Sequence, residues 1–338
     1  MKIAFLSFYS GEVFRGVETY VHELANRLTK LGHEIVVYQN GKPLNDRKYQ
    51  TVSLGIKWST NPPIKEFTKE VLKKIDAQTN IIIPTNGGWQ SLLCKFWAVK
   101  NKKKIIISGQ AGPGADEKFN LYTFPDVFVG ISTSQAEWAK KVNPAIRMVK
   151  IPNGTDLKRF SKNGDKAKID LPHPIILSVG AFVPMKRLDL AIKAVAELSK
   201  GSLLIVGSGT PDKQFLDLAN SKLPGRYLIK SVNYLEMPNI YRSADLFTFP
   251  TSTWESFGIA MVEAMASGLP VVATDDPIRR EIVRNAGLFV NPKNTNEYTK
   301  VLERALKKEW GNAPRKQAEK FSWDEIAVQY DNLFKSLK

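Results

Sequence analysis

The sequence predicts an α/β protein with two domains, each built on a doubly wound parallel sheet. At 338 residues, the chain exceeds the length at which a single hydrophobic core stops growing. Short apolar runs alternate with helical patterns, and this alternation is interrupted once, at residues 151–160. Strands that alternate with helices form parallel sheets through right-handed crossovers. We therefore expect two such sheet domains, facing each other across a cleft.

The first half carries the apolar runs that are typical of buried parallel strands. They lie at residues 2–8, 33–39, 80–85, 104–109 and 126–132. After the first run, Val21, Leu24 and Leu28 fall on one face of a predicted helix. Gly32 is placed to end that helix. A second helix is predicted over residues 65–75.

A Pro- and Gly-containing segment, IPNGTDLKRF, separates the two halves and is followed by a polar stretch up to Pro174. Strands are then predicted at residues 174–182, 202–208, 226–232, 245–251 and 270–275. The last segment is an amphipathic helix that Ser322 can cap. We expect an amino-terminal domain of residues 1–155, a carboxyl-terminal domain of residues 156–321, and a helix at about 322–338 that packs back on the first domain.

The charge balance is strongly basic, with 49 Lys and Arg against 33 Asp and Glu. Up to residue 155 the numbers are 22 and 12, so the first half carries most of the excess. An anionic membrane surface, an acidic substrate or nucleic acid would each fit this charge. An ordinary solvated lysine-rich surface fits it equally well. No recognised nucleic-acid motif accompanies the charge, which disfavours a nucleic-acid partner.

Location is indicated by three features. The single cysteine, Cys94, excludes an internal disulfide and suits a reducing compartment. The first apolar run is too short for a signal peptide. No run approaches the roughly 20 apolar residues of a membrane span. We expect a cytoplasmic protein, which could also bind at the inner face of the membrane.

The stretch WESFGIAMVEAMASGLPVV places two carboxylates around a predicted helix start. Glu255 precedes the helix, and Glu263 lies two turns inside it, about 12 Å further along the axis. The first-turn N–H groups, near Phe257, Gly258 and Ile259, suit a diphosphate. Carboxylates accept hydrogen bonds from paired hydroxyls, so the three features match a nucleotide sugar. Two solvated charges at a helix entry are the equally weighted alternative.

This stretch resembles the Glu-x7-Glu motif of glycosyltransferase family 4, in the retaining GT-B class. Further segments resemble that family in its own order. They are RGVETYVHELANRLTKLGHEIVVY, IPNGTDLKRF, ILSVGAFVPMKRLDLAIKA, LLIVGSG and EIVRNAGLFVNP. The resemblance implies two Rossmann-like domains, a nucleotide-diphosphate sugar (UDP- or GDP-linked) as co-substrate, and neither metal nor a further cofactor.

The resemblance also implies roles for individual residues. Glu255 would contact the transferred sugar, with backbone donors from Phe257, Gly258 and Ile259, and Glu263 would bind the ribose. Lys186 would neutralise the diphosphate, under a loop that contains Gly16. Gly207 would line the nucleotide side of the site.

Three departures from the family pattern bear on activity. Ala181 stands where the family usually has an arginine, so we expect Arg187 or Arg15 to supply the missing charge. Arg15 itself replaces the first glycine of the amino-terminal loop. Gln110 stands where the family often has a histidine near the sugar. It can donate a hydrogen bond but cannot take up a proton.

The leading hypothesis is a metal-independent retaining glycosyltransferase with a glycan, lipid-linked or small-molecule acceptor. The loop after residue 108 could shape the acceptor site through Gln110, Asp116 and Glu117, although an ordinary surface loop is the slightly favoured alternative. The alternatives are a non-catalytic sugar-nucleotide-binding relative, or another GT-B enzyme such as a phosphorylase or an epimerase. The basic first half favours peripheral contact with an anionic membrane.

Overall fold

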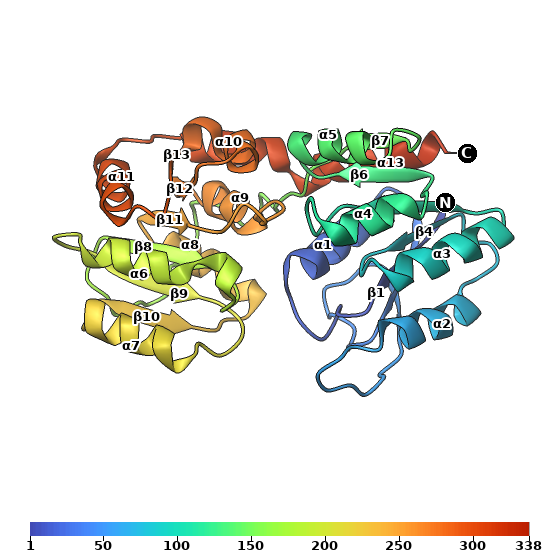
Figure 1. The fold of residues 1–338 in the computed structure, drawn as a ribbon, viewed down its shortest axis with the longest axis horizontal. Helices are drawn as coiled ribbons and strands as arrows, with labels where there is room; N and C mark the ends of the chain where they lie inside the picture. The colour runs from blue at the N-terminus through green and yellow to red at the C-terminus, as the bar shows by residue number, and fades with distance from the viewer. Residues whose placement is uncertain (338) are drawn as a thin grey trace. The chain divides into compact units, whose positions relative to one another are not determined.

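The computed structural model describes residues 1–337 and divides into two compact units (Figure 1). Unit 1 contains Met1–Gly154 together with the carboxyl-terminal segment that begins at Trp323. Unit 2 is Thr155–Ser322. These boundaries differ by one residue from those expected from the sequence. None of the helices in residues 1–337 has the length and apolar character needed to cross a membrane.

Unit 1 is built on a seven-stranded parallel sheet with the order β3-β2-β1-β4-β5-β6-β7. The strands are β1 (Lys2–Ser7), β2 (Glu34–Gln39), β3 (Gln50–Ser53), β4 (Ile81–Pro84), β5 (Lys104–Ser108), β6 (Val127–Gly130) and β7 (Met148–Lys150). Ile3 in β1 pairs with Ile35 on one side and Ile81 on the other, and all three are fully buried. The strand order reverses between β1 and β4, which makes this the switch point of the sheet.

Helices cover both faces of this sheet. On one face lie α2 (Ile64–Lys74), α3 (Trp89–Lys100) and α4 (Ala115–Tyr122) (Figure 1). α5 (Thr133–Val142) follows β6. α1 (Gly16–Lys30) packs against α13 (Trp323–Lys335). The hydroxyls of Tyr20 and Tyr330 meet at 3.2 Å between these two helices, so the carboxyl-terminal helix belongs to the core of unit 1.

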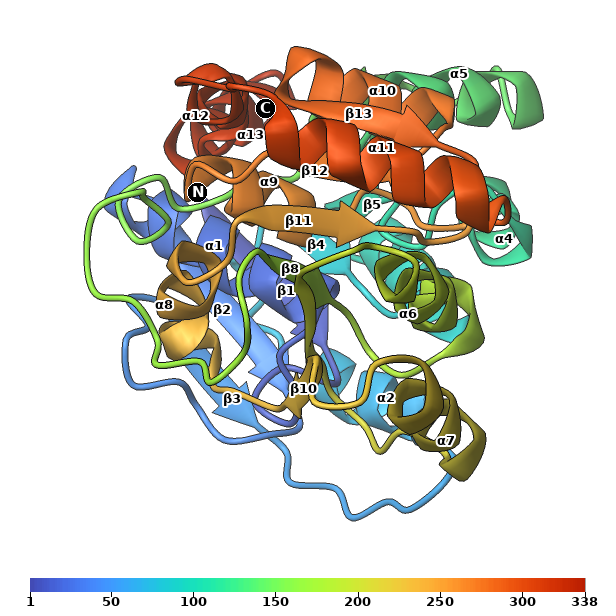
Figure 2. The ribbon, with the colours of Figure 1, turned by 90° about the vertical axis from the view of Figure 1, so that its left-hand side faces the viewer.

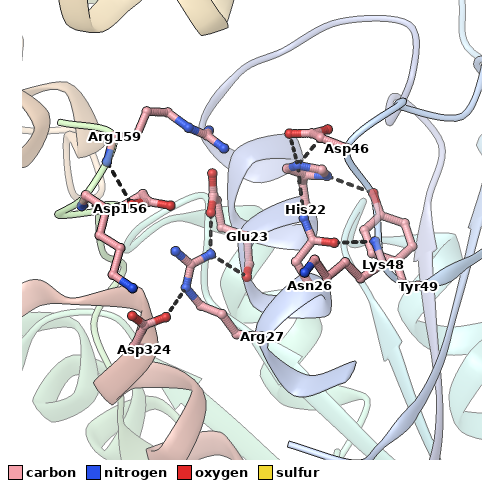
Figure 3. A network of polar contacts seen from close by, with 11 residues as sticks. His22, Glu23, Asn26, Arg27, Asp46, Lys48, Tyr49, Asp156, Arg159 and Asp324 are labelled. Carbon is pink, nitrogen blue, oxygen red and sulfur yellow. Dashed lines mark hydrogen bonds and ion pairs between the residues drawn. The ribbon is translucent and has the colours of Figure 1, made fainter. Parts of the chain in front are cut away.

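A polar network on α1 strengthens this attachment (Figure 3). The Arg27 guanidinium donates to the Asp324 carboxylate of α13 at 2.8 Å and also pairs with Glu23 one turn earlier. On the neighbouring turn, buried His22 bonds to the Tyr49 hydroxyl at 3.0 Å. This histidine therefore ties α1 to the segment before β3.

Unit 2 is built on a six-stranded parallel sheet with the order β10-β9-β8-β11-β12-β13. The strands are β8 (Ile175–Val179), β9 (Ser202–Val206), β10 (Tyr227–Lys230), β11 (Leu246–Phe249), β12 (Val271–Thr274) and β13 (Gly287–Val290). The order reverses between β8 and β11. The loops that follow these two strands therefore meet at the position where open α/β sheets hold their ligands.

Helices also cover both faces of the second sheet (Figure 2). α6 (Leu188–Ala196), α7 (Lys213–Lys222) and α11 (Thr295–Lys307) lie on one face, over a core that includes Ile176, Leu203 and Val272. α8 (Met237–Arg242), α9 (Ile259–Ala266) and α12 (Ala313–Ala318) lie on the other. α10 (Pro277–Val283) contacts α9 and α12.

All ten strands expected from the sequence are present, but three further strands were not predicted. They are β3, β7 and β13, and each lies at an edge of its sheet. Edge strands need only one neighbour and are half-covered, so their sequences lack the continuous apolar run of a central strand. In β3, for example, Gln50 and Ser53 are exposed.

Candidate functional site

The candidate site lies at the switch point of unit 2. The loop after β8 leads through a short 3₁₀ helix, Pro184–Lys186, into α6. The loop after β11 leads through residues 250–258 into α9. The two loops are joined by a backbone hydrogen bond of 2.8 Å from the Ser252 N–H to the Met185 carbonyl.

Lys186 and Glu255 form an ion pair between these loops. The Lys186 ammonium donates to the Glu255 carboxylate, and the two side chains are 20% and 12% exposed. The ammonium also lies 5.7 Å from the centre of the Phe249 ring. The sequence assigned the lysine to a diphosphate and the glutamate to a sugar, and the structure places the two groups in contact. A pair this shielded is not the solvated helix-entry charge that was the alternative for Glu255.

Arg279, which the sequence did not single out, holds the loop that carries Glu255. Its side chain is fully buried on α10. It donates to the Ser252 carbonyl at 2.7 Å and to the Glu255 carbonyl at 2.8 Å, and it pairs with Asp276. Burial lowers the pKa of the guanidinium, while Asp276 and Glu255 oppose that shift. Nothing in the sequence distinguishes Arg279 from Arg280, which is exposed and pairs with Asp275.

Gly258 begins α9 with a φ of +87°, in the left-handed region that favours glycine. A Cβ atom at this position would lie 2.8 Å from both the Phe249 ring and the Met261 methyl group. The glycine is thus already required by packing within unit 2. The neighbouring Phe257 ring is buried against Phe321. Ile259 is the first helical residue, and the N–H groups of this first turn have no helical carbonyl to bind.

Glu263 lies inside α9, as expected, and is buried. Its carboxylate accepts a hydrogen bond of 2.8 Å from the Tyr241 hydroxyl on α8. Tyr241 is fully buried, and both its burial and the carboxylate raise the pKa of its hydroxyl well above the usual value. Like Glu255, Glu263 is therefore not a solvated charge. No feature of the sequence singled out Tyr241, because an aromatic residue on an apolar helix is normally a core residue.

Three other predicted residues of unit 2 surround these loops. Arg187 caps α6 in the left-handed region, with φ of +49°, a conformation that strains a non-glycine residue. Its charge helps to lower the pKa of the Arg279 guanidinium, so the missing arginine at Ala181 has a nearby cation. A Cβ atom at Gly207 would lie 2.0 Å from the Gly180 carbonyl oxygen. Any side chain at residue 207 would therefore collide with the backbone at the end of β8, which explains why this residue is a glycine.

Arg15 and Gly16 lie at the amino end of α1 in unit 1, and both are exposed. The Arg15 N–H donates to the carboxylate of buried Glu18 at 3.1 Å, which closes the first turn of the helix. Burial raises the pKa of Glu18. The expected contact of Arg15 and Gly16 with a diphosphate stays a prediction.

Gln110 forms a reciprocal amide pair with Asn153, the buried asparagine near the end of unit 1. The Asn153 amide donates to the Gln110 carbonyl at 2.8 Å, and the Gln110 amide donates back at 3.2 Å. The Gln110 amide also donates to the Ser108 hydroxyl at 2.8 Å. These bonds give Gln110 a structural role, and its expected position beside a sugar stays a prediction.

A small polar pocket of about 120 Å³ lies beside Gln110, at the carboxyl ends of β4 and β5. Its wall includes Glu117 and Asn120, both buried. Glu117 accepts hydrogen bonds from the Ala111 N–H at 2.9 Å and from the Asn120 amide at 3.0 Å, yet burial raises its pKa to about 7. The side-chain carbonyl oxygen of Asn120 is buried without a hydrogen-bond partner. The pocket therefore offers hydrogen-bond acceptors to a hydroxyl-bearing group.

Residues that could hold a metal ion are not grouped together in residues 1–337. No three His, Cys, Asp or Glu side chains there are placed to hold a metal ion.

Comparison with known proteins identifies the second unit. Residues 160–322 match the family model described as glycosyl transferases group 1. The carboxyl-terminal unit belongs to this family. The matched region contains Lys186, Glu255, Glu263 and Arg279, so the whole candidate site of unit 2 lies within it.

Two curated relatives are glycosyltransferases by name. An uncharacterized glycosyltransferase of Methanocaldococcus jannaschii is 32% identical over 176 residues, which is 48% of this chain and 44% of the relative. A GDP-mannose-dependent monoacylated alpha-(1-6)-phosphatidylinositol monomannoside mannosyltransferase of Corynebacterium glutamicum is 29% identical over 211 residues, 55% of each chain. The chain thus spans about half the length of these relatives.

A solved structure, HepE of Anabaena in complex with UDP and glucose, shares the fold of the whole chain. The match has a TM-score of 0.79 at 15% identity and covers 99% of this chain and 100% of that one. The predicted GT-B fold class, with two doubly wound Rossmann-like units, is confirmed.

Proposed function

We propose that this protein is a retaining glycosyltransferase that moves a sugar from a nucleotide-diphosphate sugar to a glycan, lipid-linked or small-molecule acceptor. The observation that carries the proposal is the shielded pair of Lys186 and Glu255 at the amino end of α9, with Glu263 one turn inside that helix rather than the two turns expected from the sequence. A cation, a helix amino terminus and two carboxylates suit the phosphates and hydroxyls of such a donor.

In this proposal the bound donor separates the ion pair of Lys186 and Glu255 and gives each residue a new partner. A phosphate oxygen takes the place of the Glu255 carboxylate at the Lys186 ammonium, and Glu255 then accepts hydrogen bonds from the sugar hydroxyls. Lys186 and the first-turn N–H groups of α9 stabilise the charge that develops on the departing diphosphate. Glu263 accepts hydrogen bonds from the ribose. Arg279 keeps Glu255 in place through the backbone of its loop.

Retention follows from the path of one proton. When the sugar–phosphate bond breaks, the departing phosphate oxygen can take the proton of the acceptor hydroxyl, which attacks from the same face of the sugar. No protein base is then required, which suits a chain in which Gln110 stands where the family often has a histidine. Gln110 would contribute only a hydrogen bond.

The nucleotide of the donor is UDP or GDP in this proposal. The HepE structure contains UDP, whereas the Corynebacterium relative is named as GDP-mannose-dependent. On the acceptor side, the pocket beside Glu117 and Asn120 supports a hydroxyl-bearing acceptor. The charge excess of the amino-terminal half supports contact with an anionic membrane from the cytoplasmic side.

A non-catalytic nucleotide-sugar-binding protein is the second candidate, and Ala181 and Gln110 favour it. Release of nucleotide that depends on an added acceptor would exclude it. Transfer of the sugar to free phosphate would instead indicate a phosphorylase.

The first test is thermal unfolding with UDP, GDP, ADP and their sugar conjugates, in the absence of metal. A ligand at 100 times its dissociation constant adds about 2.7 kcal/mol to the stability of the unit that binds it. For a unit of this size the shift in melting temperature is about 5–10 °C. One nucleotide should produce that shift in the wild type and in Asp217→Ala, which removes an exposed carboxylate of α7.

The matched variant Glu263→Ala should lose the shift. If no nucleotide shifts the melting of the wild type, the donor site proposed for unit 2 is wrong. An equal shift in Glu263→Ala would show that the nucleotide binds without this carboxylate.

A further inference from the structure

The helices α3 and α4 lie on the same face of the unit 1 sheet (Figure 1). Both helices, and the turn after α4, expose large apolar side chains. We call them the α3–α4 surface. Its members are between 44% and 65% exposed and comprise Trp89, Phe96, Val99, Phe119, Tyr122 and Phe124. A single exposed apolar residue needs no explanation, but six from two helices and the turn after them form a surface that normally marks an interaction site.

Trp97 of α3 and Leu121 of α4 pack in the core of unit 1, but both helices also expose large apolar groups. α3 buries the small side chains of Ser91, Cys94 and Ala98 against the sheet. α4 buries Glu117 and Asn120 together with Leu121, while Phe119 and Tyr122 face solvent. A surface helix of a globular protein ordinarily has the opposite pattern. Packing of unit 1 therefore does not account for the exposed rings.

The adjacent helix α2 shows that this arrangement is not imposed by the sheet. α2 covers the same face and packs against α3 (Figure 1). It buries Phe67 and Val71 and exposes Lys69 and Lys73, as an ordinary amphipathic helix does. The exposed apolar surface is confined to α3, α4 and the turn that follows.

The charges around the α3–α4 surface select an anionic partner. Residues 89–115 contain five lysines and no Asp or Glu, whereas α4 carries one exposed acid, Asp116, beside its lysine. Lys100 and Lys102, at the carboxyl end of α3, and Lys118 on α4 are exposed. Aromatic rings flanked by lysines on one side of a protein are typical of binding in the interface of an anionic bilayer. A nucleic acid would use the lysines but leave Val99 and Phe96 without a role.

We propose that the α3–α4 surface docks the protein on an anionic phospholipid bilayer. The aromatic rings would enter the headgroup region, where amphipathic rings are favoured, and the lysines would contact the acidic headgroups. The inference deepens the membrane contact of the proposed function, and it is tested without the transfer reaction. A failure here therefore leaves the donor site untouched, and the reverse also holds.

The experiment is flotation of the purified full chain with vesicles of phosphatidylcholine alone, or of phosphatidylcholine mixed with phosphatidylglycerol. The protein should float only with the mixed vesicles, and added salt should release it. Phe96→Ser combined with Phe119→Ser should abolish flotation. Leu235→Ser combined with Val328→Ser, which removes exposed apolar groups elsewhere, should not.

A second pair of variants separates the α3–α4 surface from net charge. Lys95, Lys100 and Lys118 are changed to Gln in one variant, and the exposed Lys213, Lys222 and Lys300 of unit 2 in the other. Each lysine near an anionic surface changes the partition coefficient by about fivefold, so the first variant should lose about a hundredfold. The second should bind nearly as the wild type does. Circular dichroism and melting temperature verify that each variant is folded.

Three results would overturn the proposal. The first is equal binding, or none, with the two kinds of vesicle. The second is an equal loss of binding in the two lysine variants, which would show that only net charge matters. The third is self-association without vesicles that Phe96→Ser abolishes, which would make a second copy the occupant of this surface.

Discussion

The two units share one architecture but carry different kinds of side chain at the switch points of their sheets. In unit 2 the loops after β8 and β11 are held by charges, with Lys186 paired to Glu255 and Arg279 bound to the loop backbone. In unit 1 the loops after β1 and β4 are held by side-chain amides: Asn86 accepts a hydrogen bond from the Phe8 N–H at 2.9 Å, and Gln90 accepts one from the Asn86 N–H at 2.8 Å. The buried acid Glu117 lines the pocket beside Asn86. The parallel sheet thus fixes where a site can lie, and the side chains on the loops decide which ligand chemistry it suits.

The largest expected effect concerns the charged loop of unit 2. Arg279→Met removes the side-chain donor to the carbonyls of Ser252 and Glu255 and the charged partner of Asp276. Breaking a buried pair in this way should lower the unfolding free energy of unit 2 by about 3–5 kcal/mol. Hydrogen exchange in increasing urea, measured on peptides from each unit, gives the unfolding free energy of each unit separately. The unfolding free energy of unit 1 should be unchanged.

Arg280→Met is the matched control for this variant. Arg280 and its partner Asp275 are 59% and 40% exposed, so its loss should cost less than about 1 kcal/mol. Equal losses for the two variants would show that Arg279 does not hold the loop.

A smaller effect is expected from the buried acid of unit 1. Burial raises the pKa of Glu117 from 4.5 to about 7, so the folded chain keeps its proton over a range in which the unfolded chain has lost it. The contribution of Glu117 to stability therefore falls as pH rises through this range, by about 3 kcal/mol in total. Glu117→Gln should remove this dependence, measured as the difference in unfolding free energy from the wild type between pH 4.5 and pH 7.

The exposed neighbour Asp116 provides the control. Asp116→Asn should leave the pH dependence of the wild type in place. If Glu117→Gln also keeps the pH dependence, Glu117 is ionised in the folded protein. Both units would then hold an ionised carboxylate in their loops.

The smallest effect is expected at the Tyr241–Glu263 bond. Tyr241→Phe removes a hydrogen bond to a charged group and should cost about 1–2 kcal/mol of stability in unit 2. Because Glu263 would also lose its orientation, the nucleotide that stabilises the wild type should bind about 3–10-fold more weakly, as measured by calorimetry.

Tyr227→Phe removes an exposed hydroxyl that bonds to Asn220 and should change neither quantity. A drop in stability for Tyr241→Phe with unchanged nucleotide affinity would make Tyr241 a core residue only.

The sequence predicted the central strands well because they are buried on both faces and read as continuous apolar runs, as in KIAFLS and PIILSV. It also predicted that Glu255 and Glu263 bracket a helix start, because a Phe-Gly pair precedes the helical pattern there. Edge strands such as β3 escaped prediction, since their residues are partly exposed and alternate weakly.

By itself, then, the sequence determined the two α/β units and the spacing of the two glutamates, because hydrophobic period and chain order are local properties. Only the tertiary structure decided that Lys186 meets Glu255, that Arg279 rather than Arg280 is buried, and that Tyr241 binds Glu263. It also decided that α3 exposes Trp89 and Phe96. These facts depend on which side of each element faces the sheet, and that is set by contacts between residues far apart in the chain.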